Sequence, residues 1–212
     1  MPTGRGSFDT TDETRGAAES DETYPSRATG PLKLPARYHS SMNDDIDRDL
    51  PMRVGDALRD AEETLAVAES CTGGLIGATI TSIPGASDYF DAGLTTYAYD
   101  AKRRHLGVSR EALDEHGAVS EPVALEMAQG VRDVTDVTWG ISVTGVAGPT
   151  GGTEDDPVGT VYIGISYAGP WGTATTEATV SRYEFDGDRA AIRAKTVEQA
   201  LEDLLSAVDR IH

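Results

Sequence analysis

The sequence predicts an α/β fold in three layers, α/β/α, built around a mixed β-sheet. Short apolar runs alternate with segments of helical periodicity between residues 51 and 144, as in parallel strands joined by helices. Two β-rich runs then follow at 158–167 and 173–185, joined by a Gly-Pro turn, which indicates a hairpin. A long amphipathic helix comes last, so helices are available for both faces of the sheet.

The elements expected before residue 110 each have a local signal. A proline suited to a first helical turn, followed by apolar residues at helical spacing, predicts a helix near 51–63. An uninterrupted apolar run predicts a buried strand at 65–68, and the pattern at 75–83 is helical until a Pro-Gly pair ends it. A strand is then expected at 92–98 and a short helix at 99–106.

The second half begins with a typical helix start, in which Ser120 is the cap and a proline stands in the first turn. Apolar residues continue on one face of this helix to position 134, and a strand is expected at 137–144. A loop rich in Gly, Pro and acidic residues at 145–157 precedes the hairpin. The last helix opens at Asp186 and keeps an apolar face to its end.

Residues 1–41 are predicted to form a disordered tail of mixed charge, separate from a folded domain at 42–212. The tail is rich in Gly, Ser, Thr, Pro and Asp, and its scattered apolar residues follow neither a helical nor a strand period. Its acidic and basic residues nearly balance. The folded domain therefore carries almost all of the formal net charge of −18.

This charge excludes several classes of partner. With 36 acidic and 18 basic residues, the chain lacks the cationic surface that nucleic acids and anionic membranes require. Only three of the basic residues are lysines. Such an acidic, lysine-poor composition predicts a protein of a high-salt cytoplasm, because salt screens the repulsion between like charges. An ordinary acidic protein is the alternative interpretation.

The remaining composition predicts a cytoplasmic protein without a metal site. No run of about 18 apolar residues is present, and residues 1–21 contain no apolar core of a secretory signal. The single cysteine, Cys71, excludes an intramolecular disulfide and a cysteine-based zinc site. The four histidines lack the spacing of a helical metal site.

The first candidate site is the strand-to-helix turn at 69–74. A helix N-terminus offers unpaired N–H groups to an anion, and Gly73 and Gly74 allow close backbone approach. Ser70 stands at the end of the expected strand, where open α/β sheets bind their ligands. An ordinary capped turn is the alternative interpretation of this segment.

The second candidate site is Tyr97 with Lys102, just after an expected strand. Lys102 and Lys195 are the only lysines of the folded domain, and the position of Lys195 on an amphipathic helix is explained by its exposure to solvent. A lysine removed from water has a lowered pKa and can act as the general base that a serine nucleophile needs. The alternative is a surface charge beside Arg103 and Arg104.

The third candidate is the loop at 144–152, which follows a strand and contains four glycines. Such a loop can surround a ligand with backbone donors. No lysine of the Walker type follows any glycine-rich loop, which excludes a P-loop ATPase.

Together these segments resemble the C-terminal deamidase domain of the competence/damage-inducible protein CinA, which is also found alone as nicotinamide-nucleotide amidase. The resemblance covers about residues 51–211, in the family's order. Two positions depart from the common pattern of the family: Ala98-Tyr99 and Asp156, which replaces a basic residue. The matching segments are 68–74, Thr96-Tyr97 with Lys102, 116–123, 145–152, 157–161, and 187–189 with Arg193.

The resemblance implies a CinA-like fold and hydrolysis of the carboxamide of nicotinamide mononucleotide to nicotinate mononucleotide and ammonia. Ser70 would be the nucleophile and Lys102 its base, with Tyr97 supporting one of them. The N–H groups around 72–74 would face either the oxyanion or the phosphate. The partner is a small nucleotide, no metal or cofactor is needed, and at least a dimer is implied. The residues implied to bind substrate are Thr72, Gly73, Gly74, Thr144, Gly145, Gly148 and Arg189.

Three alternatives remain at the level of the sequence. A cysteine amidase would use Cys71 as nucleophile, assisted by Glu69 and Lys102, because a thiolate is intrinsically the better nucleophile. A non-catalytic nucleotide-binding module would keep the glycine loops and tolerate the loss of Lys102. A scaffold protein would use the same motifs only to close turns.

Overall fold

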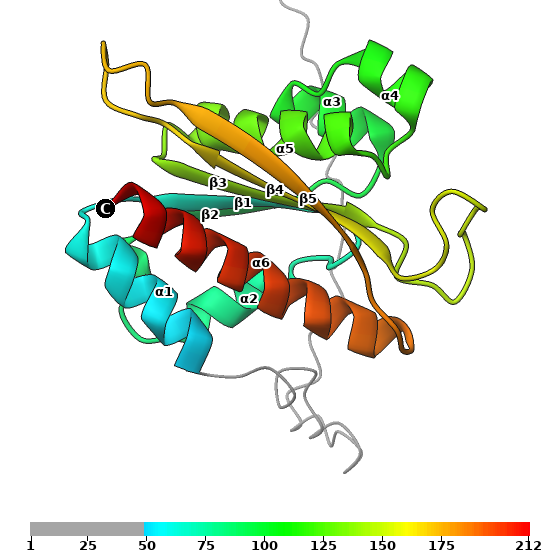
Figure 1. The fold of residues 1–212 in the computed structure, drawn as a ribbon, viewed down its shortest axis with the longest axis horizontal. Coiled ribbons are helices and arrows are strands. Elements are labelled where there is room, and N and C mark those ends of the chain that lie inside the picture. The colour runs from blue at the N-terminus through cyan, green and yellow to red at the C-terminus, as the bar shows by residue number, and fades with distance from the viewer. Residues whose placement is uncertain (1–48) are drawn as a thin grey trace, which may run out of the picture. The chain divides into compact units, whose positions relative to one another are not determined.

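Six α-helices, five strands and one short 3-10 turn make up residues 49–212, which the computed structural model describes (Figure 1). The tail expected at 1–41 lies outside the described residues. In chain order the elements are α1 (Asp49–Asp60), β1 (Leu65–Glu69), α2 (Leu75–Thr81), η2 (Ala86–Asp88), β2 (Phe90–Thr95), α3 (Tyr99–Leu106), α4 (Arg110–His116), α5 (Glu121–Thr135), β3 (Trp139–Gly145), β4 (Thr160–Tyr167), β5 (Glu177–Glu184) and α6 (Arg189–Ile211).

The strands form one mixed sheet in the order β2-β1-β3-β4-β5. β1 pairs in parallel with both β2 and β3, whereas β4 pairs antiparallel with β3 and β5. The carboxyl ends of the three parallel strands consequently meet at one edge of the sheet. Ligand sites of open α/β sheets form at such an edge.

Helices cover both faces of the sheet, which confirms the predicted three-layer α/β/α class (Figure 1). One apolar cluster joins Leu65 and Val67 of β1 to α1, α2 and α6, and a second joins Ala66 and Ala68 to α3, α4 and α5. Every residue of β1 is buried because both faces of this strand are covered.

Four strands of the structure, β2, β3, β4 and β5, are shorter than expected. β2 ends at Thr95 rather than at 98, because β1 ends at Glu69 and offers no further ladder partner. The second hairpin strand begins at Glu177 rather than at 173, so the connection after β4 runs through residue 176.

One helix was not predicted from the sequence at all. α4 has only seven residues and buries only Ala112 and Leu113, too few to show a helical period. Its start is nevertheless well formed, since the Ser109 hydroxyl accepts a hydrogen bond from the Ala112 N–H at 3.1 Å.

No helix within residues 49–212 is long and apolar enough to cross a membrane.

The acidic surface leads to a prediction about salt. The melting temperature should rise between about 0.1 M and a few molar KCl, and most steeply below about 1 M, where the Debye length falls from about 10 Å to 3 Å. Differential scanning fluorimetry across a KCl series measures it. A flat profile would contradict adaptation to high salt.

Candidate active site

Ser70 and Lys102 meet at the carboxyl edge of the parallel strands. Ser70 follows β1 directly, and its N–H donates to the Val143 carbonyl at 3.1 Å, which fixes the strand end against β3. Lys102 lies on α3, and its side chain extends to Ser70 and to the backbone of Thr96. Its Nζ lies 2.9 Å from Ser70 Oγ and 2.6 Å from the Thr96 carbonyl oxygen.

The environment of Lys102 favours the neutral amine. The residue has no exposed surface, and burial is the main cause that lowers the pKa of its amine from 10.5 to about 8. Among the ion pairs of residues 49–212, none joins Lys102 to a carboxylate that would restore the charged form. A neutral amine at 2.9 Å can accept the proton of the Ser70 hydroxyl.

Cys71 has the opposite character from an activated nucleophile. Its side chain is buried in the apolar cluster that also contains Leu75 and Ile76. Burial, the largest cause, raises the pKa of the thiol from 9.0 to about 11, so the thiol stays protonated at neutral pH. This environment disfavours the cysteine amidase alternative.

Glu69 occupies the N–H groups at the start of α2. Its buried carboxylate accepts from Gly74 N–H at 2.9 Å and Ile76 N–H at 3.2 Å through Oε2, and from Gly77 N–H at 2.9 Å through Oε1. The Gly73 N–H is also engaged, at 3.2 Å from the Ser70 carbonyl. Donors that the sequence assigns to a ligand are thus held by the protein's own groups.

Two further N–H groups of the turn lie against the Cys71 sulfur. Within the described chain, the backbone N–H groups of Cys71 and Thr72 donate to no backbone or side-chain oxygen, but both interact with the Cys71 thiol. The Thr72 side chain itself is fully buried, and its Oγ1 has no hydrogen-bond partner. Any contact of Thr72 with a ligand therefore has to come from its backbone.

α6 brings the three candidate segments together. Arg193 donates through Nε to the Thr72 carbonyl at 3.1 Å, and its Nη2 also contacts that oxygen. Arg189, one turn earlier, donates to the Gly148 carbonyl at 2.7 Å and lies 3.5 Å from the Tyr97 hydroxyl. The first turns of α6 therefore contact the turn at 69–74, the 144–152 loop and the segment after β2.

Tyr97 does not lie against the Ser70–Lys102 pair. Its side chain is 66% exposed, and its hydroxyl contacts Arg189 rather than Ser70 or Lys102. The backbone of the preceding residue, Thr96, is what touches the lysine amine. The structure thus places Tyr97 at the mouth of the site, beside a cation.

The candidate residues at the end of β3 and just after it have structural roles. The buried Thr144 hydroxyl donates to the Ala118 carbonyl at 2.6 Å. A Cβ on Gly145 would approach the Thr160 carbonyl to 2.6 Å, so a larger residue would push β3 from β4. Gly148 has a φ of +76°, which favours glycine.

Asp156, where the resemblance leads one to expect a basic residue, contacts side chains of the β4–β5 hairpin. Its carboxylate accepts from the Tyr162 hydroxyl at 3.2 Å and lies 4.0 Å from Arg182 of β5. Its charge is therefore balanced within the hairpin, away from Ser70.

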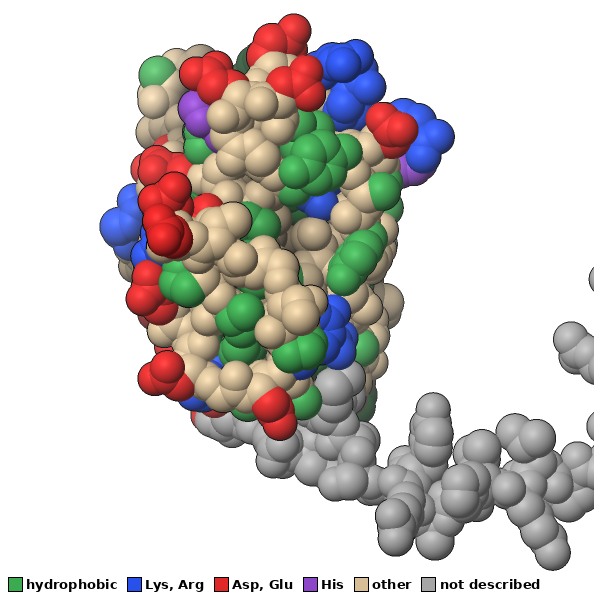
Figure 2. Space-filling view, turned by 90° about the vertical axis from the view of Figure 1, so that its right-hand side faces the viewer, with side chains coloured by type: hydrophobic (Ala, Val, Ile, Leu, Met, Phe, Trp, Pro, Cys, Tyr) green, Lys and Arg blue, Asp and Glu red, His purple; other side chains and the backbone are tan. Residues whose placement is uncertain are grey.

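Figure 2 shows the end of the molecule that carries this edge of the sheet. Acidic side chains lie along its rim, and the centre consists mainly of backbone and hydrophobic side chains with a few basic ones. Within residues 49–212, no three His, Cys, Asp or Glu side chains are grouped so as to hold a metal ion.

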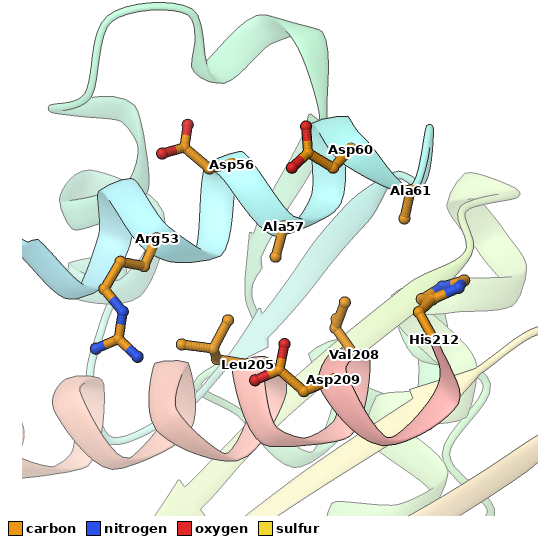
Figure 3. Close-up of a pocket in the computed structure, with 9 residues that line it drawn as sticks. All are labelled: Arg53, Asp56, Ala57, Asp60, Ala61, Leu205, Val208, Asp209 and His212. Atoms are coloured by element: carbon orange, nitrogen blue, oxygen red, sulfur yellow. The ribbon is translucent and has the colours of Figure 1, made fainter.

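A groove of about 560 Å³ lies elsewhere, between α1 and α6 (Figure 3). Its lining includes Arg53, Asp56, Asp60, Asp209 and His212. In Figure 3, Arg53 and Asp209 point into the space between the two helices, whereas the carboxylates of Asp56 and Asp60 point away from α6. None of the residues singled out above lines this groove, and it contains no nucleophile paired with a base. Hydrogen-bond chemistry rather than concavity therefore identifies the candidate site.

Sequence reasoning did not find the roles of Glu69 and Arg193. The available signal for Glu69 was an acidic residue shortly before a helix start, where the dipole favours negative charge. For Arg193 no local signal exists, because its partner Thr72 is 121 residues away in the chain.

Comparison with known proteins gives matches over most of this domain. Residues 47–208 match the family model described as the CinA C-terminal domain. A CinA-like protein of Salinibacter ruber is 46% identical over 172 residues, covering 79% of this chain and 40% of that protein. A CinA-like protein of Nostoc punctiforme is 49% identical over 153 residues, covering 71% and 35%. The chain thus spans about two fifths or less of these relatives.

Solved structures show the same fold. A competence-damaged protein (CinA) superfamily protein from Klebsiella pneumoniae 700603 has a TM-score of 0.71 at 32% identity, covering 77% of this chain and 98% of that one. The competence/damage inducible protein CihA from Agrobacterium tumefaciens has a TM-score of 0.70 at 37% identity, with coverages of 76% and 94%.

Proposed function

Because this chain belongs to the CinA C-terminal domain family, we propose that it is an amidohydrolase that converts nicotinamide mononucleotide to nicotinate mononucleotide and ammonia. Ser70 is the nucleophile and Lys102 the general base. The observation that carries the proposal is the 2.9 Å contact between Ser70 Oγ and the buried Lys102 Nζ. Nucleophile and base within hydrogen-bond reach are the recurrent arrangement of covalent amide hydrolysis.

The reaction proceeds in two halves. Lys102 accepts the Ser70 proton as Oγ attacks the carboxamide carbon, and the resulting ammonium returns a proton to the departing nitrogen, which leaves as ammonia. A water then attacks the acyl-enzyme ester, Lys102 accepts its proton, and the proton returns to Ser70 Oγ as nicotinate mononucleotide is released. The N–H groups of Cys71 and Thr72, which meet only the weakly accepting Cys71 sulfur, are the donors proposed for the developing oxyanion, because oriented backbone donors stabilise such a charge.

Arg189 is the cation proposed for the phosphate of the substrate. Its guanidinium has five N–H donors, and among residues 49–212 the contacts to Gly148 and Tyr97 leave others without an acceptor. The exposed Tyr97 ring beside it offers a surface for the ribose or the pyridinium ring. A small nucleotide would then lie between Arg189 and Ser70.

The test is ammonia release from nicotinamide mononucleotide by the purified chain in molar KCl, with nicotinate mononucleotide identified as the second product. A non-catalytic nucleotide-binding module would give no ammonia but a raised melting temperature with the same ligand. A scaffold would show neither response. Either result would refute the proposed hydrolysis.

The pH dependence of turnover is a direct consequence of the lysine's environment. Only the neutral amine accepts the Ser70 proton, so kcat should fall about tenfold per pH unit below the Lys102 pKa of about 8 and level off above it. A kcat profile from pH 6 to 10 at fixed KCl measures this. A rise that continues towards the ordinary value of 10.5 would contradict a buried base.

A further inference from the structure

Glu69 stands immediately before the nucleophile, yet its carboxylate turns away from it. The side chain is 1% exposed and makes its three hydrogen bonds to N–H groups of Gly74, Ile76 and Gly77. No hydrogen bond joins it to Lys102 or Ser70 among the described contacts. A buried carboxylate is costly unless its oxygens are satisfied in this way.

We propose that Glu69 is a positioning residue that sets the place of Ser70 Oγ by clamping the turn between β1 and α2. Its backbone belongs to the sheet, since Glu69 pairs with Val143 on one side and Thr95 on the other. Its side chain is hydrogen-bonded to the start of α2 through the three N–H groups. Ser70 directly follows Glu69, so the strand pairing and these hydrogen bonds together fix its position.

The clamp also decides what the turn can bind. The N–H groups of Gly74, Ile76 and Gly77, which the helix dipole would offer to an anion, are taken by the carboxylate. A substrate phosphate there would meet a buried negative charge. Within the described turn, the N–H groups that donate to no oxygen are those of Cys71 and Thr72, which lie against the Cys71 sulfur, and the phosphate has to lie elsewhere.

Loss of the clamp should act on chemistry more than on substrate affinity. Displacement of a nucleophile by about 1 Å costs about 10²-fold in rate. The proposed phosphate contact at Arg189 is made from α6 and does not pass through Glu69. For Glu69→Gln, whose amide replaces one accepting oxygen by a donor, we expect kcat to fall 10- to 100-fold and KM to change less than threefold.

Glu126→Gln is the matched control. Glu126 on α5 also accepts a backbone N–H at a helix start, that of Ser109 at 2.7 Å, and the Ser109 hydroxyl at 2.9 Å. It hydrogen-bonds to neither Ser70 nor Lys102. The same chemical change there should lower the melting temperature but leave kcat unchanged.

Turnover of nicotinamide mononucleotide tests the clamp only if the proposed function is right. A second readout therefore measures the reactivity of Ser70 without this substrate. Phenylmethanesulfonyl fluoride sulfonylates an activated serine: the Oγ–S bond forms, fluoride leaves and the base takes the proton. Intact-mass spectrometry follows the rate, and Ser70→Ala should take no label. We expect Glu69→Gln to react at least tenfold more slowly than wild type, and Glu126→Gln at the wild-type rate.

The outcomes separate the two proposals. If the wild type labels at Ser70 but releases no ammonia, the substrate is wrong while slow labelling of Glu69→Gln still supports the clamp. Equal labelling rates for folded wild type and Glu69→Gln overturn the clamp. An equally large decrease of the labelling rate in Glu126→Gln also overturns it. If Glu69→Gln does not fold, Glu69→Asp keeps the charge but is one methylene short, and the same tenfold criterion applies to it.

Discussion

Ser70→Ala should reduce ammonia release from nicotinamide mononucleotide by at least about 10³-fold, because the acyl group then has no acceptor. The substitution removes only one oxygen, from a half-buried position at the end of β1. Substrate contacts made from α6 remain in place. We therefore expect binding, measured by calorimetry with the unreacted nucleotide, to change little while turnover disappears.

Cys71→Ala is the natural control for this experiment, because the two residues are neighbours in one turn. The thiol is buried, and burial raises its pKa to about 11, so its loss should leave most of the turnover. A small cavity in the core should lower stability by about 1 kcal/mol. Reversed results, with Cys71→Ala inactive and Ser70→Ala active, would establish the thiol as nucleophile.

Replacement of Lys102 should have the next largest effect. Loss of a general base costs about 10²–10⁴ in rate, and here the upper end applies because Lys102 also activates the nucleophile. Lys102→Arg should lose nearly as much activity as Lys102→Ala, because arginine does not release its proton in this pH range. Both variants should still bind the mononucleotide.

The burial of Lys102 requires one more variant. A guanidinium is larger than an ammonium, and a residue without exposed surface leaves it little room. Lys102→Met keeps the length of the side chain without the amine, so it separates lost basicity from disturbed packing. Thermal melts of all three variants should accompany the kinetics.

The competing role for Lys102 is an electrostatic one, in which its charge holds the phosphate. Arginine should then restore much of the turnover, and alanine or methionine should mainly raise KM. Resolved values of kcat and KM for the three variants decide between these roles. The lowered pKa and the contact with Ser70 Oγ both favour the base.

Much of the fold was predictable because its signals are local. Each element is indicated by residues within it: β1 by its apolar run, α5 by the proline in its first turn, and α6 by its amphipathic face. The short helix α4 was missed because seven residues carry too little periodicity. The end of β2 was misplaced because it depends on where its neighbour β1 ends.

For the candidate site, the residues were predictable from the sequence but their contact was not. Ser70 stands out at a strand-to-helix turn, and Lys102 stands out because lysine is scarce in this chain. Their contact spans 32 residues, and it exists only because β1 and the chain leading to α3 meet at one edge of the sheet. Sequence reasoning could name both residues but not measure the distance between them.

What the sequence determined by itself is the class of the fold, the order of its elements and the two residues proposed for the chemistry. Only the tertiary structure decided that Lys102 is buried against Ser70, that Cys71 faces the core and that Glu69 binds α2 rather than a ligand. The physical reason is that periodicity and capping act within a few residues, whereas burial, pKa and hydrogen-bond partners depend on which distant segments pack together.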